Sequence, residues 1–151
     1  MGTNYYLHTN NKSLAEQIGD YTITDSPDWG YLIHIGKRAC GWLPLFQAHP
    51  GIKSVKDIEM WCKNPEFRIY DEYDSELSWE QLKTDLICFN GGTDGAIPKR
   101  CVSALSANSP AYDANMPNYV PVSHFSYCNG KYAHLYFKDE QGYEFTREEF
   151  C

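Results

Sequence analysis

An apolar run at positions 31–35, followed by two glycines, limits the folds that this chain can adopt: Tyr31, Ile33 and Ile35 would share one face of a strand. The five residues read Tyr-Leu-Ile-His-Ile, and a period of two is typical of a β-strand that buries one face. Residues 42–46 read Trp-Leu-Pro-Leu-Phe, a second apolar run whose proline favours an edge position or a bulge. We therefore predict a β-hairpin here, with the strand at 31–35 in the centre of a sheet.

Gly36 and Gly41 mark the predicted reversal of this hairpin and place Lys37 and Arg38 at its tip. Glycine adopts positive φ without steric cost, which suits a tight turn or a close approach of the backbone to a partner. Two cations beside exposed backbone amides can hold a phosphate group. A solvated tip without a ligand is the alternative, because the chain has no glycine-rich nucleotide-binding motif.

Three serine-based capping boxes mark the predicted helix starts, and they begin at Ser13, Ser54 and Ser78. The first helix is expected to be short, and the other two to cover 54–63 and 78–89. Each of these two carries an apolar stripe, which includes Trp61 in one helix and Trp79 in the other. Strands that alternate with capped helices predict an α+β fold in which both stripes pack on one face of the sheet.

The chain is predicted to form a single domain over residues 1–151, with a mainly antiparallel sheet and two or three short capped helices. Residues 1–90 form its α+β core. Residues 91–121 are rich in proline, serine and asparagine and are expected to form an irregular arm. Residues 122–151 are expected to form a C-terminal β-meander, because Asn129-Gly130 is a strong hairpin motif.

The composition excludes several classes of function. Acidic residues outnumber basic ones by 20 to 13, for a net charge of -7, which argues against direct binding to a nucleic acid. No apolar stretch approaches the roughly 18 residues that a transmembrane helix needs, and no signal peptide is recognised. A cytoplasmic protein without membrane contact is therefore expected.

The six cysteines are spread along the chain without a CxxC pair, and such thiols stay free in a reducing cytoplasm. A zinc site can be drawn from Cys88, Cys101, His124 and Cys128. Their spacing, however, lacks the paired-ligand rhythm of known zinc sites. We therefore predict no metal, no cofactor and no structural disulfide.

Residues 66–85 are strongly acidic, with seven carboxylates against one arginine and one lysine. Such a segment can be a solvated face, or it can meet a basic groove that normally carries nucleic acid. Tyrosines within it supply aromatic anchors of the kind that protein interfaces favour. The predicted partner-binding residues are Tyr70, Asp71, Glu72, Tyr73, Asp74 and Glu76.

Short motifs follow one another over residues 1–90: the Met1–Leu7 start, His34–Lys37 with Gly41-Trp42, Gly51-Ile52, Trp61, and Ile69–Tyr73 with Ser78. Together they resemble a group of small uncharacterised proteins encoded by bacteriophages. Members of that group often carry a cysteine pair where this chain has Asn11–Glu16, so a metal site is not carried over. The resemblance implies a phage protein that acts in the cytoplasm of its bacterial host.

Two hypotheses about function follow. In the first, the chain is a non-enzymatic inhibitor of a host defence protein, similar to an anti-CRISPR protein that occupies the basic groove of a CRISPR effector. The acidic segment favours this hypothesis, as does the lack of a Ser-His-Asp or Cys-His arrangement in the residue order. In the second, the chain binds a small defence nucleotide, as a sponge or a hydrolase, through His34, Lys37, Arg38 and Trp42. His34 alternatively lies at the edge of the core without a ligand, and a homodimer stays open in both cases.

Overall fold

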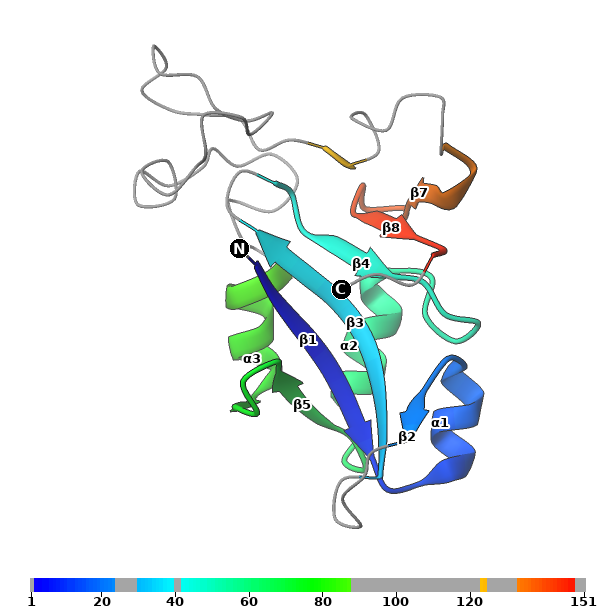
Figure 1. Cartoon of the computed structure of the whole chain (residues 1–151), viewed down its shortest axis with the longest axis vertical. Helices are drawn as coiled ribbons and strands as arrows, with labels where there is room; N and C mark the ends of the chain where they lie inside the picture. The colour runs from blue at the N-terminus through cyan, green and yellow to red at the C-terminus, as the bar shows by residue number, and fades with distance from the viewer. Residues whose placement is uncertain (1, 24–29, 40–41, 88–122, 125–132, 149–151) are drawn as a thin grey trace.

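The computed structural model describes residues 2–23, 30–39, 42–87, 123–124 and 133–148, which form an α+β fold around a sheet (Figure 1). The strands are β1 (Gly2–Thr9), β2 (Thr22–Ile23), β3 (Tyr31–Ala39), β4 (Leu45–Gln47), β5 (Arg68–Asp71), β6 (Glu76–Leu77), β7 (Tyr136–Lys138) and β8 (Glu144–Thr146). The helical segments are α1 (Lys12–Ile18), α2 (Val55–Cys62), α3 (Trp79–Leu82), the π-helical η1 (Lys83–Ile87) and the 3-10 helix η3 (Ala133–Leu135).

The strand order is β6-β5-β1-β3-β4-β8-β7, with β2 paired to β3 beside this path. Among the strands described, only β4 and β8 run parallel; the other pairs are antiparallel. The predicted α+β class with a mainly antiparallel sheet is therefore confirmed.

The centre of the sheet is the long antiparallel pair of β1 and β3, as predicted for the strand at 31–35. Tyr5 and Leu7 of β1 are buried in the core together with Ile33 and Ile35 of β3. Complete burial of one such side chain contributes about 1.5 to 3 kcal/mol. The alternation in the sequence therefore marks the face of the central pair that stabilises the fold.

The predicted hairpin joins β3 to β4, but the prediction that Lys37 and Arg38 form its tip is wrong. Both residues lie within β3, which pairs with β1 on one side and with β4 on the other. A Cβ on Gly36 would lie 3.0 Å from the carbonyl oxygen of Leu45 and 3.2 Å from the side chain of Leu86. Gly36 thus serves a close approach between strands and helix, and the pairing on both sides of β3 outweighs the turn preference of glycine.

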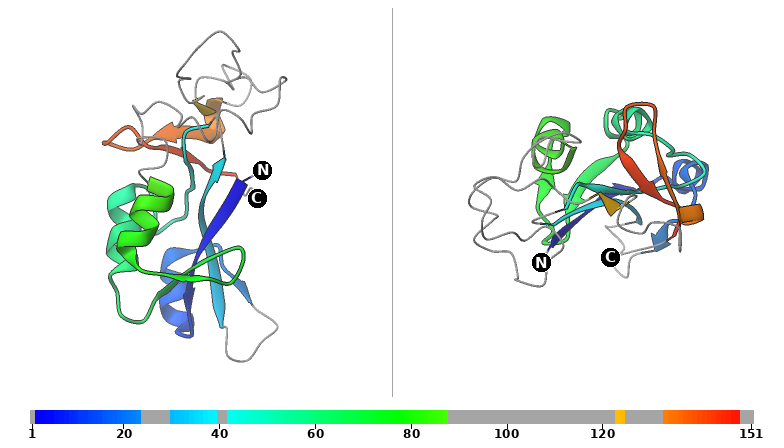
Figure 2. Two further views of the ribbon diagram at one scale, coloured as in Figure 1. Left: turned by 90° about the vertical axis from the view of Figure 1, so that its left-hand side faces the viewer. Right: turned by 90° about the horizontal axis from the view of Figure 1, so that it is seen from above.

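Helices α1, α2 and α3 cover the same face of the sheet (Figure 2), as predicted for the last two. The helix predicted over 78–89 is α3 followed by the π-helical η1, and residues 88–89 lie outside the described part of the chain. Ser54 and Ser78 cap α2 and α3 as predicted, and each hydroxyl accepts a backbone amide hydrogen bond of 3.1 Å. At α3 the capping box is complete, because Gln81 also accepts from the amide of Ser78 at 2.8 Å. None of the helices described is long and apolar enough to cross a membrane.

The cap of α1 is Asn11 and not the predicted Ser13. The side-chain oxygen of Asn11 accepts from the backbone amide of Leu14 at 3.2 Å, whereas Ser13 lies exposed in the first turn. Asparagine and serine are about equally good N-caps, so the sequence offers two starts two positions apart. The observed start buries Ala15 and Ile18 in the core.

A stack of phenylalanine rings joins the C-terminal hairpin of β7 and β8 to the rest of the sheet. The ring of Phe145 lies 5.3 Å from that of Phe46 in β4 and 5.4 Å from that of Phe137 in β7. This hairpin is the described part of the predicted β-meander. The predicted turn at Asn129-Gly130 and the predicted arm at 91–121 lie outside the described residues.

Candidate functional site

The six predicted partner-binding residues come together on the β5–β6 hairpin, at one edge of the sheet. Asp71 builds its turn, because one carboxylate oxygen accepts from the backbone amides of Tyr73 at 2.9 Å and Ser75 at 3.0 Å. Asp74 has a positive φ of 63°, which aspartate tolerates better than most residues do. Side chains of the turn itself therefore hold it in one conformation.

Tyr73 and Asp74 form the solvent-facing tip of this hairpin. Tyr73 is 70% exposed, and Asp74 beside it is also exposed. Glu72 is exposed as a residue, yet its Oε1 accepts from the backbone amide of Asn4 at 2.8 Å. The tip thus presents an aromatic ring next to carboxylates whose positions the turn determines.

The remaining two members connect the hairpin to the sheet. Glu76 lies 3.7 Å from Arg68 in a solvent-exposed ion pair, which typically contributes less than about 1 kcal/mol. The ring of Tyr70 is half-buried and meets the ring of His8 edge-on at 5.7 Å. Tyr70 is therefore partly used by the fold, unlike Tyr73.

The alternative predicted site consists of His34, Lys37, Arg38 and Trp42. Arg38 donates from Nη1 to the backbone oxygen of Asp85 in η1 at 3.0 Å. Trp42 stacks on the ring of His124, with 4.6 Å between the ring centres. Two of the four predicted residues are thus engaged with different parts of the fold.

His34 is held among polar and aromatic side chains of the neighbouring strands. Its Nε2 lies 2.8 Å from Oδ1 of Asn4, and its ring centre lies 5.3 Å from that of Tyr6. Burial lowers the pKa of His34 to about 4, and the side chain of Gln47 offsets part of this effect. His34 is therefore neutral at physiological pH, which matches the predicted alternative of a histidine at the edge of the core.

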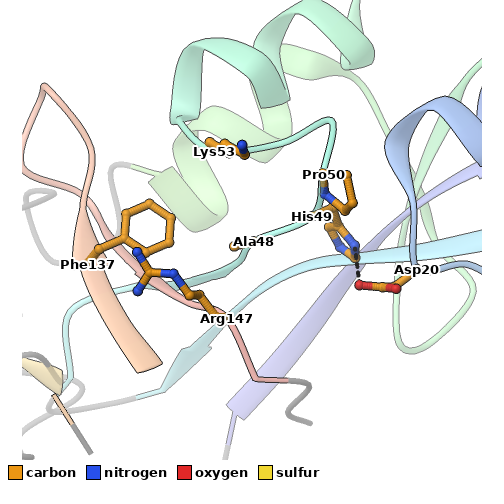
Figure 3. Close-up of a pocket in the computed structure, with 7 residues that line it drawn as sticks. All are labelled: Asp20, Ala48, His49, Pro50, Lys53, Phe137 and Arg147. Atoms are coloured by element: carbon orange, nitrogen blue, oxygen red, sulfur yellow. Dashed lines mark ion pairs between the residues drawn. The ribbon is translucent and has the colours of Figure 1, made fainter. Parts of the chain in front are cut away.

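A cavity of about 510 Å³ opens between residues 48–53 and the C-terminal hairpin (Figure 3). Its lining residues are Asp20, Ala48, His49, Pro50, Lys53, Phe137 and Arg147. Backbone hydrogen bonds hold its walls together: Ala48 donates to Thr146 at 2.9 Å, and Gly51 donates to Ile18 at 2.8 Å. These hydrogen bonds fix the position of the 48–51 segment relative to β8 and α1.

Two pairs of side chains define the chemistry of this cavity. The guanidinium of Arg147 lies 4.4 Å from the ring centre of Phe137. Across the cavity, Nδ1 of His49 lies 3.8 Å from a carboxylate oxygen of Asp20 (Figure 3). His49 also donates from Nε2 to the backbone oxygen of His34 at 2.6 Å.

Sequence reasoning missed this cavity because its residues come from four separated segments. The only feature in the sequence that points to it is the turn motif at residues 49–51, which contributes His49 and Pro50. No group of three or more potential metal ligands occurs within the residues that the structure describes. Of the zinc ligands considered above, only His124 lies among them.

Comparison of the chain with protein-family models, with curated proteins and with solved structures found no match.

Proposed function

We propose that this chain is a phage-encoded binding protein that inhibits a host defence protein, such as a CRISPR effector, in the bacterial cytoplasm. The observation that carries the proposal is Tyr73, an aromatic side chain 70% exposed at the tip of an acidic turn. Among the residues described, the other exposed large hydrophobic side chains are Ile23 and Met60, neither of which is aromatic. The resemblance of residues 1–90 to phage proteins supports the biological setting.

The turn is suited to binding because its conformation is set before a partner arrives. Asp71 accepts two backbone amides of the turn, so little conformational entropy is lost when Tyr73 is buried against a partner. Exposed tyrosines on rigid supports are typical hot spots of protein interfaces. Asp74 and Glu76 are exposed on the same hairpin as Tyr73, so the partner surface is expected to be basic.

Electrostatic attraction of this kind has a measurable signature. Exposed charges are screened beyond a Debye length of about 8 Å at physiological ionic strength. Association with the partner should therefore slow as salt rises. The rate of dissociation should depend mainly on the contacts that Tyr73 makes once the partner buries it.

The structure makes a sharper test possible than charge reversal of the whole turn. Asp71 and Glu72 hold backbone amides, so their replacement by lysine would confuse folding with binding. The double variant Asp74→Asn, Glu76→Gln removes two charges and keeps the turn, because asparagine also accepts positive φ. The control is Glu16→Gln, Glu140→Gln, which removes two exposed carboxylates from other parts of the surface, where each lies near a lysine.

The assay is phage infection of a CRISPR-defended host that expresses each variant, followed by binding kinetics with the captured effector. Tyr73→Ala and the Asp74/Glu76 variant should lose protection, and the control should keep it. Equal protection by all three variants would refute the proposal.

The alternative function, a sponge or hydrolase for a defence nucleotide at His34, Lys37, Arg38 and Trp42, has less support from the geometry. Arg38 donates to the backbone of η1, and Trp42 is stacked on His124. Loss of protection only in a Lys37→Ala, Arg38→Ala variant that folds normally would favour this alternative.

A further inference from the structure

We propose that the cavity beside the C-terminal hairpin is a binding site for a nucleoside monophosphate, with the phosphate held between Lys53 and Arg147. This site is separate from the β5–β6 hairpin, and the proposal does not depend on the function proposed above. It depends on the charges, the aromatic support and the size of the cavity.

Lys53 and Arg147 differ from the cations of this chain that pair with a carboxylate. Four other cations have a carboxylate oxygen at 3.3 to 3.9 Å: Lys12, Lys56, Lys63 and Arg68. In the described part of the chain, no carboxylate forms an ion pair with Lys53 or Arg147. Both line the same cavity (Figure 3). Two cations that line one cavity and form no ion pair with the described residues favour an anionic ligand, and a dianion most of all.

Arg147 is held in place before any ligand binds. Its guanidinium lies 4.4 Å from the ring centre of Phe137, and its Nη1 donates to the backbone oxygen of His134 at 3.0 Å. A guanidinium has five N–H donors in a planar fork, so most of them stay available for phosphate oxygens. This fork binds phosphate in a bidentate way, while Lys53 adds a flexible point charge.

The opposite side of the cavity gives the ligand its orientation. Asp20 carries an exposed carboxylate next to His49, so it repels a phosphate and accepts hydrogen bonds from hydroxyl or amino groups. Ribose hydroxyls and the amino group of a nucleobase can donate such hydrogen bonds to Asp20. Ala48 and Pro50 line the cavity between the two ends and offer apolar contact to a sugar or a base.

The size of the cavity favours a nucleoside monophosphate over a simple ion. A volume of about 510 Å³ lies within the range of roughly 300 to 1,000 Å³ that small-molecule sites occupy. Inorganic phosphate would fill only the end between the two cations. A nucleoside monophosphate would also occupy the part of the cavity lined by Asp20.

Isothermal titration calorimetry with the full chain tests the proposal. The probes are AMP, ribose 5-phosphate, adenosine and inorganic phosphate. AMP should bind most tightly, ribose 5-phosphate and phosphate more weakly, and adenosine least, because it lacks the anion. No binding of AMP, or equal binding of AMP and adenosine, would overturn the proposal. Equal affinities for AMP and ribose 5-phosphate would overturn the nucleobase part of it.

Two variants locate the binding site. Lys53→Gln changes an exposed side chain and should weaken AMP binding about tenfold, the equivalent of one charge-assisted hydrogen bond. Arg147→Gln should weaken it at least as much, and its unfolding curve shows whether the loss of the Phe137 contact harms the fold. The matched control is Lys83→Gln on η1, an exposed lysine outside the cavity. Equal AMP affinity in Lys53→Gln and the control would place the ligand elsewhere and refute the site.

Discussion

Nε2 of His34 in β3 lies 2.8 Å from Oδ1 of Asn4 in β1, which ties the two central strands together through their side chains. The contact places the ring proton on Nε2, because the amide oxygen of Asn4 can only accept. Burial lowers the pKa of His34 to about 4. Protonation of this ring is therefore coupled to unfolding of the central pair.

The first prediction is a pH dependence of stability. Histidine has a pKa of about 6.5 in an unfolded chain, so between pH 6.5 and 4 the unfolded state binds more protons than the folded state. The contribution of the neutral His34 ring to the free energy of unfolding is then complete above pH 6.5, and it is lost as the pH falls toward 4. Burial lowers the pKa of His124 to about 4 as well, so both act in the same direction.

Urea unfolding measured from pH 7.5 to 4 checks this prediction. The free energy of unfolding should fall by on the order of 1 to 3 kcal/mol for each histidine. His34→Gln should reduce the dependence, because glutamine does not titrate in this range. An identical dependence in wild type and His34→Gln would contradict the assignment.

The second prediction separates the charge of Asp71 from its role in the turn. Asp71→Ala leaves the amides of Tyr73 and Ser75 without their acceptor, and should cost about 1 to 2 kcal/mol. Asp71→Asn keeps an oxygen acceptor and should recover most of that stability while it removes the charge. Chemical denaturation of both variants is the measurement, and equal losses in the two would mean that charge, not hydrogen bonding, holds the turn.

The third prediction concerns the start of α1. Asn11→Ala removes the hydrogen bond to the amide of Leu14 and should destabilise the protein by about 1 kcal/mol. Ser13→Ala changes an exposed side chain in the first turn and should alter stability by less than about 0.5 kcal/mol. Thermal unfolding of the pair checks the assignment, and the opposite ranking would restore Ser13 as the cap.

The fourth prediction is that the thiol of Cys62 reacts slowly in the folded protein. Burial raises the pKa of Cys62 to about 12, and only the thiolate is an effective nucleophile. Native protein treated with iodoacetamide at pH 8 should stay unmodified at Cys62, whereas protein unfolded in urea should be alkylated there. Peptide mass mapping measures both. Rapid labelling of Cys62 in the native state would show that the thiol is accessible.

Local patterns predicted much of this fold. The alternation at residues 31–35 identified the central strand because one face of it is buried against helices. Ser54 and Ser78 identified two helix starts, since a serine followed by an acidic or amide residue satisfies the first free amides of a helix. These features depend on neighbours in the sequence, and so they can be read from it.

The features that were mispredicted or missed depend on distant residues. Gly36 has the residue type of a turn, but it lies within β3, where it pairs with β1 on one side and with β4 on the other. Asn11 and Ser13 are equally good N-caps by residue type, and the burial of Ala15 and Ile18 in the core determines which of them starts the helix. Lys53 and Arg147 become neighbours of one cavity only through the pairing of β4 with β8. Long-range pairing leaves no local mark in the sequence, which is why this site was not predicted.

The parallel pair of β4 and β8 also constrains the order of folding. Leu45 is opposite Glu144, about one hundred positions further along the chain, so this contact closes the longest loop among the described strand pairs and has the highest loop-closure entropy cost among them. The β1–β3 pair closes much shorter loops and can form first. On the ribosome, the N-terminal sheet should therefore assemble while β8 is still being synthesised. The C-terminal hairpin should then dock last, and the cavity lined by Phe137 and Arg147 should form only at that final step.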